Sequence, residues 1–445
     1  MANPPDSHDV TRRDFLKTTG AATASALGGS LLFASTRPSF GDAPAISPRI
    51  IGANDRIHVG IVGVKGMGGG HVKHVLEQMP GENVELSAIC DVWAKARQKT
   101  QADAKLKDDQ VFGDFRRMLD ARRELDAVIV ATPDHTHSLI SVAAMESGRH
   151  VYVEKPMTRH LDEAFRMLDV SKRTKRLVQV GAQGCSEPKW QRAREIVKSG
   201  VLGRLLWAQG SYCRNNPAGE WNYDIEPEAT EATVDWKAWL GPARKRPWSA
   251  ERYFRWRKYW DYGTGVIGDL LPHRLSPLML AMDLNEFPKT VSCIGGNLCD
   301  TDKGPGKDGK PNGERRDVAD TQLALVEFPS GVMFFLASTT SNERGVDDVI
   351  RGHKANLTLG GNKLVLEPER PFSDEIERKD ETPEEPTTTH ANHVRNFLEA
   401  MRGNGALNCP IEMGIQVQTV VSMAEKAYRE KTQVHFDPQR RKMTT

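Results

Sequence analysis

The chain has 445 residues, of which 38% are hydrophobic and 27% charged, and its formal net charge at pH 7 is +2. This length allows two domains, and the composition is that of an ordinary soluble globular protein. The near-neutral charge argues against nucleic acid or an anionic membrane as partner. The six cysteines are dispersed without a C-x-x-C, which indicates neither a zinc site nor a disulfide framework.

The N-terminus has the pattern of an export signal. Residues 11–17 read TRRDFLK, and Thr18 to Thr36 carry no charge. Paired arginines before an uncharged stretch of small residues are typical of a twin-arginine signal, although a flexible basic tail is the alternative. We predict a signal over residues 1–45, recognition by the twin-arginine export machinery and a periplasmic location.

A strand-like run, Ile57–Val62, leads into a glycine-rich turn and then into helical spacing. Strand, glycine turn and helix form the first unit of a dinucleotide-binding fold, in which the turn and the helix N-terminus hold a pyrophosphate. A G-x-G-x-x-G frame anchored on Gly63 and Gly68 places Lys65 at the middle glycine. Either the turn shifts register to use Gly66, or Lys65 itself neutralises phosphate charge; a turn without a ligand is the remaining alternative. The expected cofactor contacts here are Gly63, Lys65, Gly66, Met67 and Gly68.

The next strand, Val84 to Cys90, ends at Asp91. A carboxylate at this place accepts hydrogen bonds from the adenosine ribose and repels a 2′-phosphate. Asp91 therefore favours NAD over NADP as cofactor, with a solvated strand-end aspartate as the alternative.

Further strands and helices alternate as far as residue 180. Apolar strands are expected at 125–132, 150–153 and 177–180, and one helix at 161–172. This order predicts an α/β fold with a doubly wound parallel sheet over residues 55–180 and a ligand at the carboxyl ends of its strands. His135 and His137 follow one strand, but without a cysteine or carboxylate cluster they predict no metal site.

Four motifs together resemble the Gfo/Idh/MocA oxidoreductases. They are the glycine turn followed by His71, Cys90-Asp91, the run TPDHTH at 132–137, and Glu154-Lys155-Pro156. The resemblance implies a Rossmann domain that binds NAD, and it places Lys155 beside the nicotinamide and the substrate hydroxyl. It adds as cofactor-binding residues Thr132, Pro133, His135, His137, Glu154 and Lys155.

After Gly181 the pattern changes. Long loops carry most of the tryptophans, and strands without intervening helices follow at 290–295, 321–328 and 332–340. We predict a C-terminal α+β domain over residues 181–440 with an open, mainly antiparallel sheet. In the resembling family such a sheet faces the nicotinamide and builds oligomers, which implies a homo-oligomer, either a dimer or a tetramer.

Aromatic and basic residues interleave at 251–262, ERYFRWRKYWDY. Sugar and acidic-sugar pockets use such side chains, so we predict a substrate loop rather than a plain interface or core loop. The predicted substrate-binding residues are Tyr253, Arg255 and Trp256.

The predicted chemistry centres on Asp269 and His273. Their spacing matches the family's aspartate and histidine on one helical face, whereas Ser276 replaces a further aspartate and leaves the substrate undefined. Oxidation of a secondary alcohol needs a base, and a neutral histidine suits that role. By resemblance His273 is the general acid/base, Asp269 its partner and Lys155 the anchor; a histidine without chemistry is the alternative.

Three functions are compatible with this pattern. We favour an NAD-dependent oxidoreductase of a sugar, polyol or sugar derivative. Its cofactor is expected to stay tightly bound and to be recycled internally, because free NAD should be scarce outside the cytoplasm. The alternatives are an NAD-dependent glycosidase or lyase and a non-catalytic dinucleotide-binding regulator.

Overall fold

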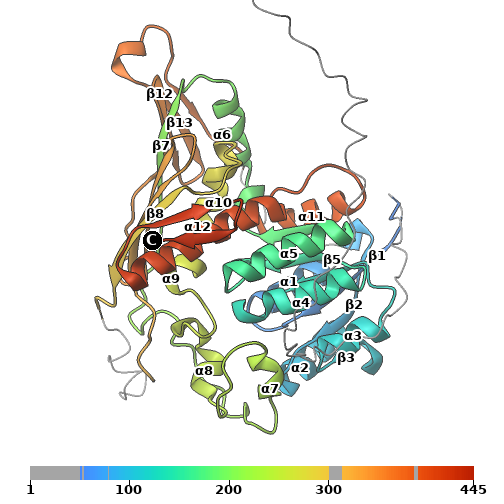
Figure 1. Cartoon of the computed structure of the whole chain (residues 1–445). Coiled ribbons are helices and arrows are strands. Elements are labelled where there is room, and N and C mark those ends of the chain that lie inside the picture. The colour runs from blue at the N-terminus through green and yellow to red at the C-terminus, as the bar shows by residue number, and fades with distance from the viewer. Residues whose placement is uncertain (1–50, 53–54, 79, 300–312, 385–388) are drawn as a thin grey trace, which may run out of the picture. The chain divides into compact units, whose positions relative to one another are not determined.

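The computed structural model describes residues 51–445 except 53–54, 79, 300–312 and 385–388. The predicted export signal lies outside the described residues. The described part of the chain forms a six-stranded and a ten-stranded sheet, as Figure 1 shows.

The first sheet has the strand order β3-β2-β1-β4-β5-β6, and all neighbouring strands are parallel. The order reverses between β1 and β4, which opens a crevice at their carboxyl ends. These features confirm the predicted doubly wound sheet. Its strands are β1 (Ile57–Val62), β2 (Val84–Cys90), β3 (Val111–Phe112), β4 (Ala127–Val130), β5 (His150–Glu154) and β6 (Val178–Gly181).

Helices connect these strands, as parallel pairing requires. They are α1 (Met67–Lys73), α2 (Ala94–Ala104), α3 (Phe115–Ala121), α4 (Asp134–Glu146) and α5 (Leu161–Thr174). A helix from the end of the chain, α11 (Thr389–Met401), also packs against β5 and buries Phe397 in the same core as Ile57. The first sheet is therefore covered partly by the C-terminal part of the chain.

The second sheet is mostly antiparallel, as predicted, but β7 and β10 are parallel to each other. The sequence analysis did not predict β11, β14, β15 or β16, which are short and lack a continuous apolar run. The strands are β7 (Leu205–Cys213), β8 (Thr290–Gly296), β9 (Thr321–Glu327), β10 (Met333–Thr339), β11 (Asp348–Gly352), β12 (Ala355–Gly360), β13 (Lys363–Pro368), β14 (Lys379–Glu381), β15 (Val434–Asp437) and β16 (Lys442–Thr444).

Two helices cover one face of this sheet: α10 (Pro272–Ala281) packs against β7, and α12 (Ile411–Glu430) against β8 (Figure 1). Helix α12 also packs against α5, so one core joins the two sheets. The chain passes from the first sheet to the second between β6 and β7, near the domain boundary that we propose between residues 180 and 181. The remaining helices are α6 (Pro188–Lys198), α7 (Trp236–Leu240), α8 (Ala250–Phe254) and α9 (Gly265–Asp269).

None of the helices in the described ranges combines the length and the apolar character that crossing a bilayer requires.

Candidate active site

A cavity of about 900 Å³ lies at the carboxyl ends of the parallel strands. The first sheet supplies residues that directly follow its strands, and the second half of the chain closes the cavity. The lining includes, from the first sheet, Gly63, Asp91, Thr132, Pro133, Glu154 and Lys155, and from the later segments Tyr212, Arg214, Tyr223, Trp256, Arg257, Asp269 and His273.

The glycine turn has the geometry of a phosphate cradle. Gly63 has a φ of +83°, and a Cβ on Gly68 would lie 1.7 Å from the Gly63 carbonyl oxygen, so α1 can begin against the end of β1 only without that side chain. Gly66 has a φ of +57° and open space where a side chain would stand. The frame therefore runs from Gly63 to Gly68, with Lys65 at the middle position. Gly66 and Met67 line the cavity, whereas Gly68 is buried behind it.

Asp91 lies where the ribose is expected, and it lines the cavity. Its two carboxylate oxygens accept backbone N–H bonds from Val64 at 3.0 Å and Trp93 at 2.8 Å. Burial raises the pKa of Asp91, but these hydrogen bonds favour its charged form. The carboxylate is thus fixed in direction, and each oxygen keeps a further lone pair for a ligand hydroxyl.

The two histidines of the TPDHTH run have different positions. His137 lines the cavity, and its ring contacts the carbonyl oxygens of Thr132 at 2.8 Å and Pro156 at 2.9 Å. His135 does not line the cavity: its Nε2 lies 2.8 Å from the Trp239 carbonyl oxygen, and burial lowers its pKa to about 4. His135 therefore anchors the tryptophan-rich loop to α4, and a direct cofactor contact does not fit its place.

Asp134 lies inside the TPDHTH run, but the sequence analysis did not name it as a site residue. It lines the cavity and is 4% exposed, and burial raises its pKa to about 7. Its place in that run, directly after a strand, was the signal that could have identified it.

Lys155 and Asp269 form the polar centre of the cavity. The Lys155 ammonium donates to the Asp269 carboxylate at 3.0 Å and to its carbonyl oxygen at 2.6 Å. The same carboxylate accepts from Arg257 Nε at 3.1 Å and Trp221 Nε1 at 3.2 Å. Burial raises the pKa of Asp269, but the charges of Lys155 and Arg257 outweigh it and hold that pKa well below its ordinary value. Asp269 thus keeps an anionic carboxylate that fixes the lysine.

His273 lies in the same cavity, but not on one helix with Asp269. Asp269 ends α9 and His273 lies in α10, because Pro272 has no N–H to donate to the Gly268 carbonyl and the helical ladder is interrupted there. The His273 ring stacks on Tyr212 with centroids 4.7 Å apart. Burial, followed by the Lys155 charge, lowers the pKa of His273 to about 3. The ring is therefore neutral in the resting protein.

Glu154 lies directly before Lys155 and borders the cavity. Its Oε1 is 2.7 Å from His71 Nε2 and accepts a bond from Gln183 Nε2 at 2.9 Å. Burial raises the pKa of Glu154, but the His71 hydrogen bond and the nearby charges lower it overall. These contacts hold the end of β5 rigidly beneath Lys155.

The predicted substrate loop contributes different residues from those expected. Trp256 lines the cavity, and Tyr253 does so beside Trp93, near Asp91 and the predicted ribose position rather than near Lys155. Arg255 is outside the lining: its Nε donates to the Tyr223 carbonyl oxygen at 2.8 Å, and its Nη1 pairs with Glu251 at 2.9 Å.

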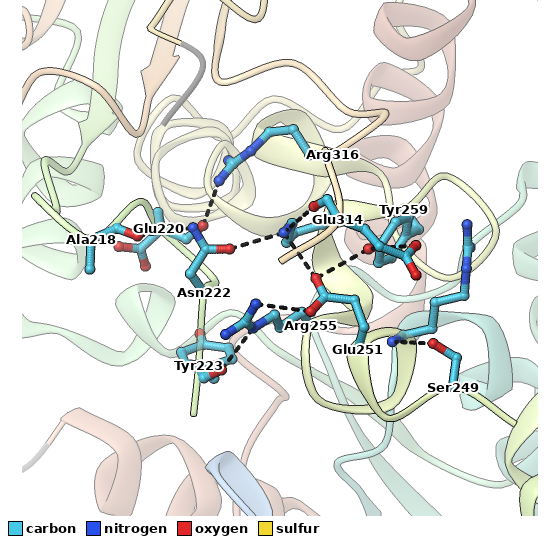
Figure 2. Close-up of polar contacts among 12 residues, drawn as sticks. Ala218, Glu220, Asn222, Tyr223, Ser249, Glu251, Arg255, Tyr259, Glu314 and Arg316 are labelled. Carbon is cyan, nitrogen blue, oxygen red and sulfur yellow. Dashed lines mark hydrogen bonds and ion pairs between the residues drawn. The ribbon is translucent and has the colours of Figure 1, made fainter. Parts of the chain in front are cut away.

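Arg257, two residues later, occupies the cavity in its place. Figure 2 shows Arg255, Glu251 and Glu314 in one polar network, with Arg255 directed to Tyr223. The network fixes the loops that carry Tyr223 and Arg257 into the cavity.

Within the part of the chain that the structure describes, no group of three or more His, Cys, Asp or Glu side chains is arranged to hold a metal ion.

Family models match both parts of the chain. The Gfo/Idh/MocA oxidoreductase model for an NAD-binding Rossmann fold matches residues 57–182, and two models for the family's C-terminal alpha/beta domain match residues 188–296 and 243–436. A model of the twin-arginine translocation signal matches residues 9–29, so the chain carries that signal.

The chain is also similar in sequence to named bacterial proteins. A protein of Saccharopolyspora erythraea named glycosyl hydrolase family 109 protein is 28% identical over 362 residues, covering 76% of this chain and 70% of the relative. One of Shewanella baltica with the same name is 28% identical over 290 residues, covering 62% of this chain and 56% of the relative. The match thus spans little more than half the length of the Shewanella protein.

Solved structures share the fold. A levoglucosan dehydrogenase in complex with NADH and levoglucosan superposes with a TM-score of 0.66 at 18% identity, over 85% of this chain and 99% of that one. An inositol dehydrogenase homologue of Azotobacter vinelandii, in complex with NADH and myo-inositol, gives 0.65 at 17% identity, over 86% and 98%.

Proposed function

The chain belongs to the Gfo/Idh/MocA family of oxidoreductases, and on this premise we propose that it oxidises a secondary alcohol of a sugar, polyol or sugar derivative. The observation that supports this most is the meeting of Lys155, Asp269 and His273 in one cavity with the glycine turn and Asp91. NAD, which this family's first domain binds, supplies the hydride acceptor.

The residues present fit this cofactor. The Gly63–Gly68 packing and the open space at Gly66 admit a pyrophosphate close to the backbone, at the point where α1 begins. Asp91 receives the ribose hydroxyls.

The remaining groups act on the substrate alcohol. The Lys155 ammonium, held by Asp269, donates a hydrogen bond to the reacting oxygen and stabilises its developing negative charge. Neutral His273 accepts the hydroxyl proton. Tyr223, Trp256 and Arg257 hold the rest of the sugar.

A second candidate is redox-neutral cleavage of a glycoside, which the glycosyl hydrolase family 109 names of two relatives favour. A ketone formed at a sugar carbon acidifies the adjacent C–H. His273 or a neighbouring group then removes that proton, and the glycosidic oxygen leaves from the next carbon, which forms a double bond. Addition of water to this double bond and return of the hydride to the ketone would complete the cycle without net oxidation. The same residues serve both candidates, and the product distinguishes them.

NADH is expected to bind more tightly than NADPH, because the fixed Asp91 carboxylate repels a 2′-phosphate. We expect a preference on the order of tenfold or more, the equivalent of about 1.4 kcal/mol. Fluorescence titration of protein freed of nucleotide measures both affinities, and Asp91→Ser should narrow the gap. Tighter binding of NADPH would contradict the assignment of Asp91.

The twin-arginine signal leads to a further proposal about the cofactor. We expect folded protein to be exported to the periplasm with NAD bound and to regenerate it in place. Desalted protein should then convert substrate without added NAD and without net NADH. Product from one glycoside alone supports the second candidate, whereas a need for two sugars, one oxidised and one reduced, supports the first. Turnover that depends on added NAD and releases stoichiometric NADH would leave an ordinary dehydrogenase.

The second sheet also offers a surface for self-association. Its face opposite α10 and α12 exposes Ile294 by 69%, Leu325 by 58% and Met333 by 51%, and the last two line a hollow of about 410 Å³. Apolar patches of this kind mark protein interfaces. We therefore propose a homo-oligomer, a dimer or a tetramer, formed through this face.

Sedimentation should find an oligomer at micromolar concentration, and Leu325→Asp should shift it toward the monomer. Leu76→Asp, at a half-exposed leucine outside this sheet, is the matched control. A monomeric wild-type protein would refute this proposal.

A further inference from the structure

Lys65, at the middle position of the glycine turn, has partners that no phosphate-binding role explains. Its ammonium lies over the rings of Trp93, 4.6 Å from the centroid, and Phe254, at 4.4 Å. It also forms an ion pair with Glu226, 161 residues further along the chain. The side chain thus joins the turn to a distant segment.

That segment, residues 221–262, forms one wall of the cavity. Ala238, Trp239, Tyr253 and Phe254 line the cavity from it, and the rings of Tyr253 and Phe254 pack against Trp93, next to Asp91. A cofactor on the turn would therefore lie between the first sheet and this wall.

The wall is attached to the first sheet at two further places. The Ala94 N–H donates to the Thr233 carbonyl oxygen at 3.0 Å, and the Asp235 N–H to the Val92 carbonyl oxygen, also at 3.0 Å. The second attachment is the contact of His135, in α4, with the Trp239 carbonyl oxygen. The contact at Lys65, in contrast to the two backbone hydrogen bonds, is made by side chains, which can separate without breaking backbone pairing.

Charge concentrates at this contact. Lys95 pairs with both Glu226 and Glu228 at 3.0 Å, so two ammonium groups share the Glu226 carboxylate. The hydrogen bond from Lys65 holds the pKa of Glu226 below its ordinary value, which keeps the carboxylate charged at neutral pH.

We infer that Glu226 and Lys65 form a latch that retains the bound nicotinamide dinucleotide by tying the 221–262 wall to the glycine turn. This inference rests on the proposed function, since it supplies the slow cofactor release that internal recycling requires. Glu226 is a positioning residue, because it acts through Lys65.

The latch and a direct phosphate contact predict opposite effects for Glu226. If the latch holds the wall, both Glu226→Gln and Lys65→Met open it and release the cofactor faster. If Lys65 instead neutralises the pyrophosphate, Glu226→Gln frees the ammonium for the phosphate and slows release, while Lys65→Met still speeds it.

In the test, the full-length protein is loaded with NADH and then mixed with excess NAD. The fall in the fluorescence of bound NADH gives the rate of release. For partly exposed pairs we expect release faster by on the order of fivefold in each single variant. The effect of the double variant should be smaller than the product of the two single effects, because the Lys65–Glu226 pair is lost in both, while Glu226→Gln also weakens the pair with Lys95 and Lys65→Met removes the contacts with Trp93 and Phe254. Glu228→Gln, whose side chain pairs with Lys95, is the matched control and should stay within about twofold of wild type.

The outcomes separate the two claims. Unchanged or slower release in Glu226→Gln, or additive effects in the double variant, would overturn the latch. The rate of NADH release from the wild-type protein tests internal recycling, and release faster than turnover would refute that proposal. The ratio of the variant to the wild-type release rates tests the latch separately.

Discussion

Replacing Lys155 or His273 by alanine is expected to lower turnover by about 10²–10⁴-fold, the usual contribution of a positioned acid–base group. Lys155 loses its bonds to Asp269 and to the reacting oxygen, and His273 loses the only basic atom of its side chain. The cofactor-binding turn does not depend on either side chain, so both variants should still bind NADH. The His273 variant should keep its thermal stability, whereas the Lys155 variant should lose some, because the buried Asp269 carboxylate loses one of its partners. Steady-state kinetics and NADH titration on the same preparations measure both.

Matched controls are Lys99→Ala and His435→Ala, two exposed residues away from the cavity, and both should keep wild-type turnover. If the Lys155 and His273 variants keep activity within a few-fold of wild type, the proposed roles are wrong.

The pH profile gives an independent check of the same proposal. Because the pKa of His273 is lowered to about 3, its ring is already neutral across the neutral range, and protonation removes the base only near pH 3. An inflection of kcat/KM near pH 7 should therefore reflect the ionisation of the Asp134 carboxyl group, whose pKa is raised by burial to about 7. This inflection should disappear in Asp134→Asn. Loss of the inflection in a His273 variant instead would contradict this assignment.

Replacing Lys258 by methionine is expected to lower the free energy of unfolding by about 3–5 kcal/mol, the usual cost of removing one partner of a buried ion pair. Lys258 is fully buried and donates to Glu251 at 3.0 Å, Asn222 at 3.0 Å and the Glu314 carbonyl oxygen at 2.6 Å. Methionine fills the volume but leaves these acceptors without their donor. Denaturant unfolding followed by tryptophan fluorescence measures the loss.

The same change should weaken substrate binding, because Glu251 also pairs with Arg255, which holds the Tyr223 carbonyl oxygen beside the cavity (Figure 2). We expect KM to rise while NADH affinity changes little. Lys99→Met, which breaks an exposed pair with Asp103, is the control and should cost only about 0.3–0.5 kcal/mol. A Lys258 variant as stable as this control would show that the network does not support the fold.

The first sheet was predictable from sequence because its signals are local. A buried parallel strand has a continuous run of apolar residues. The turn requires glycine at Gly63 for its positive φ and at Gly68 for its close contact with the Gly63 carbonyl oxygen, and both requirements arise between residues that are near in sequence. Lys155 was placed by its motif directly after β5, and its position in the cavity follows from the direction of that strand. The break between Asp269 and His273 also had a local signal, Pro272, which the spacing argument overlooked.

Other features depend on side-chain directions that only packing between distant segments decides. Arg255 and Arg257 are two residues apart in similar sequence, yet Arg255 turns to Glu251 and Tyr223 while Arg257 reaches Asp269. The partner of Lys65 is Glu226, which no spacing rule relates to the glycine turn. The sequence by itself therefore determined the fold, the family and the strand ends that carry the chemistry. The tertiary structure decided which charged groups meet, because an ion pair forms only where folding brings two remote side chains within a few ångströms and removes them from water.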